Sequence, residues 1–483
     1  MSTRRMKSNA DIWNEDYDWD AESSSESVEW EEEPEEIEEA KEEIPYIETL
    51  DSAGRARYER RQVWLQEYEE SRNCASTSQD TAFSWYSKAH RAEEEHHVED
   101  ETRLRGYMRC IEFWPSTSDI KEANRVTRRL YMRSQTLQRL EDKMMESYLR
   151  QRPSPAVERA QEKLIQLIEK QLQGKYPGCS IRPYGGSHNG FGTQCSDLDI
   201  TIITPEIIRE WNEEDGFVCH GILPKITNIV EILESEENRQ ATGLSSMENL
   251  ELINIPLAKM EFEKDGHKIE VDFSSGNING VRNTKILKIY SRIDERAVQL
   301  MTVIKKWAKK NELHGGPLYR FNTYSLVILV INFLQKGVSP PILPELSKIT
   351  ALLDCGLYDQ SVEEVVALLK WEQRPDDISI TELLIGFFAY YAQFNFSEWT
   401  VNLRRAQLTN RNTVGDDWYE NKKQRISIEC AVMARSPTRS LSEECYLAFR
   451  STLNTMNKVI WQELAGGHED EKTTEKIFDL MGL

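Results

Sequence analysis

The chain has 483 residues, of which 39% are hydrophobic and 9% aromatic, so it can build two or three domains with proper cores. Its formal net charge of −22 repels nucleic acid, and any such partner must therefore meet a local basic strip. The longest apolar run, 324–334, is too short to span a membrane. Scattered cysteines without CxxC pairs, and no apolar leader, favour a reducing compartment; we expect the cytoplasm, with the nucleus left open.

The first 45 residues are strongly acidic. Between Asp11 and Glu43 the chain carries 17 Asp and Glu residues and one lysine, a local net charge of −16. Because such a segment has little to bury, 1–45 is predicted to be a disordered, solubilising tail; a phosphorylated or partner-binding arm is the alternative. Residues 46–135 are charged and largely helical in pattern, and the sequence leaves open whether they form a small domain or an arm.

The region from Thr136 to Arg282 has an α/β pattern. Two amphipathic helices come first, and the second begins at Ser154-Pro155. The apolar face of the first helix is predicted to contain Leu137, Leu140, Met144, Met145 and Leu149. Strands are predicted at 180–183, 198–203, 252–262 and 268–273, with a helix at 222–236. Helices dominate from Asn283 to about Gln393, a second α/β stretch covers 399–432, and the last helices follow Ser442.

A glycine-rich turn precedes the strand at 198–203. Gly185 and Gly186 allow backbone conformations closed to other residues, so main-chain N–H groups can approach a phosphate, and Ser187 adds a hydroxyl donor. Asp197 and Asp199 stand two apart on the predicted strand, so both carboxylates leave one face with Cα atoms roughly 6.5–7 Å apart. That spacing suits two carboxylates that share a pair of Mg²⁺ ions about 3.5–4 Å apart.

A third carboxylate is offered by a later predicted strand. In the run Glu270–Phe273, alternation turns Val271 and Phe273 to the core, and Glu270 and Asp272 to the opposite face. Asp272 is the better candidate for a metal ligand, with Glu270 supporting it or simply exposed. The alternative for Asp272 is an ordinary exposed aspartate at a strand end.

In this order, the Gly-Ser turn, the DxD pair and the later aspartate resemble the nucleotidyltransferase superfamily of DNA polymerase β. The segments 282–284, 303–309 and 321–326 resemble its noncanonical poly(A) and poly(U) polymerase branch, and the resemblance covers roughly 137–460. It implies a bilobed α/β + α fold. The expected parts are a mixed-sheet catalytic lobe at 136–282, a mainly helical PAP-associated lobe with a nucleotide-recognition loop at 283–465, and a C-terminal tail at 466–483.

The resemblance implies template-independent addition of UMP or AMP, from UTP or ATP, to RNA 3′ ends. Asp197 and Asp199 would bridge two Mg²⁺ (or Mn²⁺) ions, and Asp272 would hold the ion that activates the 3′-hydroxyl. The implied nucleotide-binding residues are Gly186, Ser187, Asn277, Asn283, Lys305, Lys309, Thr323 and Tyr324. The two lysines lie one helical turn apart and would neutralise the triphosphate, and Thr323 would contact a phosphate.

The same resemblance places Tyr324 against the base and Asn283 at the ribose 2′-hydroxyl, with Asn277 close by. Simple alternatives are a core position for Tyr324 and a helix N-cap for Asn283. Two rival functions stay open: synthesis of 2′–5′ oligoadenylate by a superfamily cousin, and an inactive scaffold that binds RNA or a partner.

The recognition loop departs from the family pattern. Cys430 replaces an aspartate, Ala431-Val432 replace Pro-Phe, and no histidine stands at Arg435 or Ser436, where uridylyl transfer is typically marked. We therefore expect ATP and UTP to be accepted without strong preference, and a clean preference for ATP is the alternative. No RNA-recognition module is apparent, which implies an RNA-binding partner protein. Candidate RNA tracks are 125–133 and the basic residues Arg404, Arg405, Arg411, Lys422, Lys423 and Arg425, although a solvated face is the simpler interpretation of each.

Overall fold

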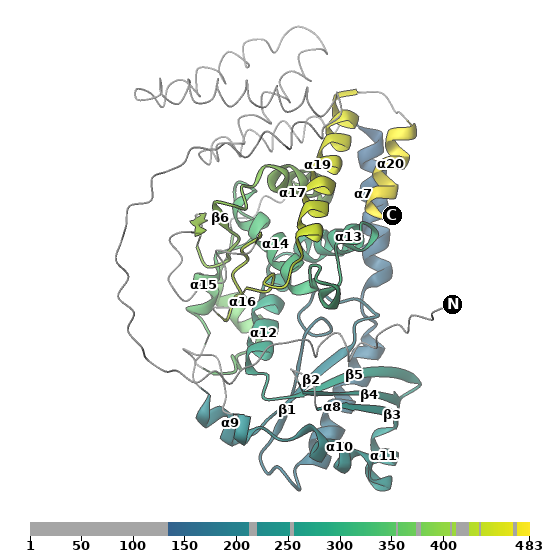
Figure 1. The fold of residues 1–483 in the computed structure, drawn as a ribbon, viewed down its shortest axis with the longest axis vertical. Coiled ribbons are helices and arrows are strands. Elements are labelled where there is room, and N and C mark those ends of the chain that lie inside the picture. Colours follow the sequence, from purple (N-terminus) through teal and green to yellow (C-terminus); the bar gives the residue numbers. More distant parts are fainter. Residues whose placement is uncertain are drawn as a thin grey trace, which may run out of the picture. The chain divides into compact units, whose positions relative to one another are not determined.

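The structure, a computed structural model, describes nine stretches of the chain (Figure 1). They are 134–211, 220–251, 256–353, 356–372, 378–405, 408–411, 425–433, 436–466 and 471–483. The predictions for the acidic tail, for 46–133 and for the basic track 125–133 lie outside these residues. Within them, no helix combines the length and the apolarity needed to cross a bilayer.

Two capped helices lead into the sheet. The hydroxyl of Ser134 accepts from the main-chain nitrogen of Leu137 at the start of α7 (Gln135–Gln151), and Ser154 caps α8 (Pro155–Leu172), which begins with proline. The predicted face of α7 is buried at its first positions. Leu149 is 60% exposed instead, because five residues beyond Met144 the helix has turned it toward solvent.

A five-stranded mixed sheet follows, in the order β1-β2-β5-β4-β3. Its strands are β1 (Ser180–Tyr184), β2 (Leu198–Ile203), β3 (Leu244–Leu250), β4 (Leu257–Lys264) and β5 (His267–Ser275). β2 and β5 pair in parallel, and the other pairs are antiparallel. β3 was not predicted, because this edge strand is mostly polar and exposed and so lacks an apolar alternation.

Helices cover one face of this sheet. α8 packs against β1 and β5, and α10 packs against β3 and β4 (Figure 1). The short elements of this region are α9 (Pro205–Glu210), the 3₁₀ turn η1 (His220–Ile222), α10 (Ile226–Glu234) and α11 (Glu236–Thr242). Leu164 and Ile168 of α8 share a fully buried core with Leu198, Ile200 and Phe273, so the strands that carry the acidic motif are anchored from behind.

The rest of the described chain is mainly helical around an aromatic core. Its elements are α12 (Ile278–Ile293), α13 (Arg296–Lys310), η2 (Gly316–Leu318), α14 (Thr323–Lys336), α15 (Leu346–Thr350), α16 (Val362–Leu369), α17 (Ile380–Gln393), α19 (Glu443–Gly466), α20 (Glu471–Met481) and the two-residue strands β6 (Trp399–Thr400) and β7 (Thr409–Asn410). The ring of Trp307 packs edge-on against that of Phe388, with the ring centroids 5.1 Å apart. The predicted architecture, a mixed-sheet lobe followed by a mainly helical one, is confirmed.

Two predicted boundaries need correction. The division at 282/283 falls inside α12, which is one continuous helix. The predicted tail at 466–483 contains α20, whose Ile477 and Met481 are fully buried. Lys310 of α13 forms an ion pair with Asp479 of α20 at 2.7 Å. The apolar residues at helical spacing explain the difference, because they give α20 a face to bury.

Candidate active site

The parallel pairing of β2 with β5 brings two of the predicted aspartates together. Asp199 and Asp272 are direct partners in the register, and Asp197 precedes β2 by one residue. Burial, then the charges of Asp272 and Asp197, raise the pKa of Asp199 to about 7. Burial also raises the pKa of Asp272, opposed by Lys259, its register partner on β4. The three carboxylates therefore repel one another beside the first residues of β2.

This donor set fits a divalent cation. Mutual repulsion among carboxylates is what a bound cation relieves. In the described stretches no three Asp, Glu, His or Cys side chains are already drawn together as a metal cage. Mg²⁺ does not need one, because it keeps several waters and is usually bound through one or two carboxylates together with substrate phosphates. Asp197, Asp199 and Asp272 are the residues that would hold it.

The glycine-rich turn passes directly over Asp199. Gly185 has φ +75°, and a Cβ at this position would lie 2.0 Å from Oδ2 of Asp199. Any other residue would therefore be both strained and in collision with the carboxylate. At Gly186, the residue predicted to bind the nucleotide, the nearest atom to an added Cβ is 3.5 Å away, so the steric demand for glycine is at Gly185.

Two side chains missed by the sequence interpretation hold this turn. The hydroxyl of Thr284 on α12 accepts from the main-chain nitrogen of Gly185 at 2.8 Å and donates to the carbonyl of Gly280. His188 lies with Nδ1 3.1 Å from the hydroxyl of Ser187. Burial, with Lys288 adding to it, lowers the pKa of His188 to about 4, so the imidazole is neutral at pH 7. The sequence did offer a clue to Thr284, because this residue directly follows Asn283 in the segment 282–284 that resembles the polymerase family.

The predicted triphosphate residues gather around a histidine that was also missed. Burial lowers the pKa of His314 to about 4, and Lys305 and Lys309 contribute. Its Nε2 lies 2.9 Å from the hydroxyl of Thr323. Burial and Lys309 lower the pKa of Lys305, while Asp197 opposes them, which brings this lysine within the field of the carboxylates. The structure thus joins Lys305, Lys309 and Thr323 into one polar cluster beside the aspartates.

Tyr324, Asn283 and the recognition loop meet in a second cluster. The phenol of Tyr324 donates to Oδ1 of Asn283 at 2.6 Å and accepts from the main-chain nitrogen of Ala431 at 3.0 Å. The thiol of Cys430 lies 3.3 Å from the Tyr324 oxygen, and the Asn283 amide nitrogen lies 3.6 Å from that sulfur. The residue that replaces the family aspartate is therefore in direct contact with the predicted ribose and base residues.

The N-cap of α12 is Asn277 and not Asn283. Asn283 lies inside α12, so its interpretation as an N-cap is wrong. Asn277 is the N-cap, and its side-chain oxygen accepts from the main-chain nitrogen of Gly280 at 2.9 Å. Its own main-chain nitrogen donates to Thr201 of β2. Asn277 therefore fixes the start of the helix that carries Asn283 and Thr284.

Three of the four described residues of the second predicted RNA track make contacts within the protein. Arg404 pairs with Glu429 at 3.0 Å and donates to the carbonyl of Ala431, so it supports the recognition loop. Arg411 is buried and donates to Phe396, and Arg425 pairs with Glu443. Arg405 is exposed, while Lys422 and Lys423 lie outside the described residues.

Of the two positions where a histidine would mark uridylyl transfer, Arg435 lies outside the described residues. Ser436 is only 3% exposed and forms a hydrogen bond with Thr438, so its site is not open to a base.

Comparison with known proteins matches both halves of the chain. Residues 140–292 match the central palm domain of mitochondrial-like poly(A) RNA polymerases, and residues 379–429 match the PAP-associated domain of the Cid1 family of poly(A) polymerases. The chain is 29% identical over 238 residues to poly(A) RNA polymerase gld-2 homolog A of Drosophila melanogaster, covering 47% of this chain and 16% of that protein. It is 28% identical over 262 residues to human poly(A) RNA polymerase GLD2, covering 52% and 50%. The chain thus spans half or less of these relatives.

Three solved structures share the fold. The complex of mtPAP with UTP superposes with a TM-score of 0.55 at 19% identity, covering 71% of each chain. The Cid1 poly(U) polymerase with Mg and 3′-dATP bound gives 0.51 at 18% identity, covering 67% of this chain and 94% of that one. The GLD-2/RNP-8 complex gives 0.53 at 22% identity, covering 70% and 98%. At such low sequence identities, this similarity shows a shared fold.

Proposed function

Because the chain belongs to the noncanonical poly(A)/poly(U) polymerase family of DNA polymerase β-like nucleotidyltransferases, we propose that it transfers nucleotides from nucleoside triphosphates to RNA 3′ ends without a template. The observation that carries the proposal is the register pair Asp199–Asp272 with Asp197 beside it. An intact set of three carboxylates next to a cationic cluster disfavours the inactive scaffold.

Each part of the site has a role in phosphoryl transfer. Magnesium, when bound, would be held by the three aspartates and would supply Lewis-acid activation of the 3′-hydroxyl and neutralisation of phosphate charge. Lys305 and Lys309 offset the negative charge of the triphosphate, and Thr323, oriented by His314, offers a hydroxyl to a phosphate oxygen. The turn at Gly185 lies against the Asp199 carboxylate, and Thr284 holds it there by accepting from the Gly185 main-chain nitrogen. These groups position the reactants, which is most of what this chemistry requires of a protein.

The nucleotide site supports weak base discrimination. Tyr324 can stack on any base, because every base has a π-face. Cys430 is a weak donor and acceptor where the family pattern has a carboxylate. Strong discrimination needs buried groups that a wrong base leaves unpaired, and a thiol supplies little of this. We therefore propose that ATP and UTP are both substrates.

RNA selection is proposed to depend on a partner. Within the described residues Arg404, Arg411 and Arg425 already have protein partners, which leaves few free cations on the predicted track. The GLD-2 protein with a similar fold was solved in complex with RNP-8. By analogy, an RNA-binding partner protein would bring this chain to its substrates.

The test is extension of an end-labelled RNA with each of the four nucleoside triphosphates and Mg²⁺. Extension by ATP and UTP, lost on Asp199→Asn, supports the proposal. A second primer with a 3′-deoxy end keeps the 2′-hydroxyl, and its extension would reveal a 2′–5′ linkage instead. If no triphosphate extends either primer while the protein binds RNA, the scaffold function replaces the transferase.

A further inference from the structure

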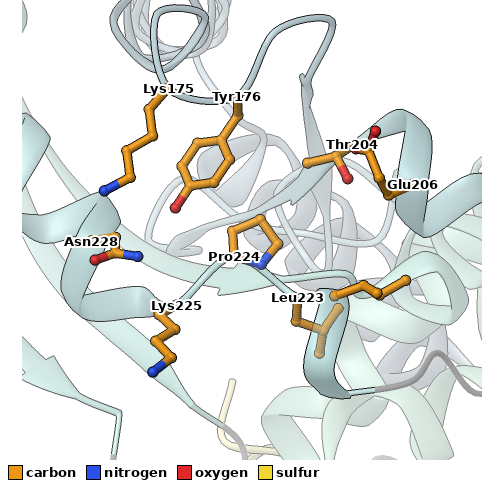
Figure 2. Close-up of a pocket in the computed structure, with 9 residues that line it drawn as sticks. Lys175, Tyr176, Thr204, Glu206, Leu223, Pro224, Lys225 and Asn228 are labelled. Atoms are coloured by element: carbon orange, nitrogen blue, oxygen red, sulfur yellow. The ribbon is translucent and has the colours of Figure 1, made fainter.

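A pocket lies at the other end of β2 from the aspartates. It has a volume of about 270 Å³ and is formed by the turn after α8, the start of α9 and the start of α10 (Figure 2). Thr204, at its edge, stands five residues after Asp199 on the chain. At about 3.3 Å per strand residue the two positions are roughly 16 Å apart, so the pocket is separate from the site of nucleotide transfer.

Several polar groups of this pocket have no protein partner in the described stretches, although Thr204 caps α9. The hydroxyl of Tyr176 is buried and has no hydrogen-bond partner in the described structure. Figure 2 shows it pointing toward Lys175 and Asn228. Neither Lys175 nor Lys225, at the rim, forms an ion pair with a carboxylate of the described stretches, whereas Glu206 across the pocket pairs with Arg209 at 3.0 Å. A buried donor without a partner costs stability, which an acceptor on a ligand would recover.

Part of the remaining wall is apolar. The ring of Tyr176 faces the pocket together with Leu223 and Pro224 (Figure 2). A ligand that satisfies both parts must carry an anionic group with good acceptors and a flat apolar body. The volume is slightly below that of pockets for drug-sized molecules, roughly 300–1,000 Å³. A single nucleotide meets these conditions, whereas an acidic peptide supplies the charge but no flat ring for the apolar wall.

We infer that this pocket binds one nucleotide of the single-stranded RNA substrate, upstream of the 3′ end. Lys175, the hydroxyl of Tyr176 and the amide of Asn228 take the phosphate, and the base lies against Tyr176 and Pro224. The inference rests on the proposed function for the identity of the ligand. The pocket also provides cations for RNA binding. Because the chain as a whole is acidic, RNA must bind where local lysines are not neutralised by carboxylates.

Tyr176→Phe is the sharpest variant, because it removes only the unpartnered hydroxyl and changes no charge. Its melting temperature should equal or exceed that of the wild type, since no protein hydrogen bond is lost. Its dissociation constant for an oligouridylate of about 16 nucleotides, measured by fluorescence anisotropy without triphosphate, should rise by roughly five- to tenfold. Lys175→Ala should reduce the slope of log Kd against log salt by about 0.7. Lys458→Ala, an exposed lysine on α19, is the control and should leave Kd unchanged.

Two outcomes overturn the inference. One is wild-type RNA affinity in both Tyr176→Phe and Lys175→Ala, whatever those variants do to binding of an acidic peptide. The other is an equal loss in the Lys458→Ala control, which would mean that charge alone sets the affinity. Extension of a dinucleotide primer, too short to reach the pocket, should be unchanged in Tyr176→Phe. If the wild type extends no RNA at all, the proposed function fails independently of these binding results.

Discussion

The hydroxyl of Tyr324 lies 2.6 Å from the side-chain carbonyl of Asn283 and 3.0 Å from the main-chain nitrogen of Ala431. One phenol therefore ties α14 to α12 and to the recognition loop, three segments far apart in the sequence. Its ring is only partly buried against the core, which is compatible with the proposed stacking on a base. The structural contact uses the phenol oxygen and the proposed stacking uses the ring, so the two interpretations of Tyr324 are compatible.

Tyr324→Phe separates these two contacts. The ring remains to stack, but Asn283 and Ala431 each lose a hydrogen-bond partner, at a cost of about 1–3 kcal/mol for a buried group left unsatisfied. We expect a lower melting temperature and a raised KM for the triphosphate, with kcat changed less. Tyr324→Ala, which also removes the stacking surface, should raise KM further. Equal steady-state constants in Tyr324→Phe and the wild type would show that the phenol does not hold the loop.

Asp199→Asn should abolish extension while sparing the fold. Burial and two neighbouring carboxylates disfavour the charge of Asp199, so an uncharged isostere relieves repulsion in the folded protein. The melting temperature without metal should stay the same or rise. Extension should fall by on the order of 10³-fold, because charge stabilisation through a metal site is worth several kcal/mol. Glu270→Gln, an exposed carboxylate on the neighbouring strand β5, is the matched control, and activity that survived in Asp199→Asn would remove the metal assignment.

Helix α20 should be essential for stability although the sequence suggests a tail. Ile477 is fully buried, and Ile→Ala changes in cores cost about 2–5 kcal/mol. We expect Ile477→Ala to lower the melting temperature markedly and Lys476→Ala, its exposed neighbour, to leave it unchanged. A melting curve of Ile477→Ala that overlaid the wild type would show that α20 does not dock in solution.

The local elements were largely predictable because their signals are local. Capping serines, a proline at the first helical position and alternating strands give bounds that agree with the structure within a few residues, as at β2. β3 was not predicted because an exposed edge strand need not alternate apolar and polar residues. The start of α12 was misplaced because Asn277, and not Asn283, is its N-cap.

The acidic motif was predictable for the same reason, whereas its supports were not. Asp197 and Asp199 stand two positions apart in the sequence, and Asp272 has a strand pattern of its own. Thr284 and His314 act through partners 99 and 9 residues away, and a hydroxyl or an imidazole in isolation carries no signal of such contacts. The use of Arg411 in the core was hidden likewise, since charge in a sequence does not reveal burial.

Lys336 should make stability depend on pH. This lysine is buried at the end of α14, where its ammonium donates to the carbonyl of Asn402, and burial lowers its pKa to about 7 against the opposing charges of Glu429 and Glu345. Its unfolded pKa is about 10.4. Between these values the unfolded chain binds a proton that the folded chain does not, so the free energy of unfolding rises with pH across that window.

Lys336→Met should remove this dependence. Methionine has a similar length, and the Asn402 carbonyl keeps a second donor, Asn332. At pH 7 the variant should be more stable than the wild type, and the difference should shrink toward pH 10. Denaturant unfolding of both proteins across this range measures the difference directly, with exposed Lys458→Met as the control. A difference independent of pH would mean that Lys336 stays charged in the folded protein.

Cys430 should limit how well the site tells bases apart. Its thiol touches Tyr324 and Asn283, and it contributes no charged acceptor there. Cys430→Asp places a carboxylate at this point, which a base without a matching donor would leave unpaired in a partly desolvated site. The spread of kcat/KM among the four triphosphates should therefore widen by on the order of tenfold, the effect of one well-placed hydrogen bond to a charged group. Cys430→Ser, neutral and nearly isosteric, should keep the wild-type spread. Competition assays with all four triphosphates measure this spread of kcat/KM. If the wild-type enzyme already uses one triphosphate almost exclusively, another residue reads the base and the weak discrimination assigned to Cys430 is wrong.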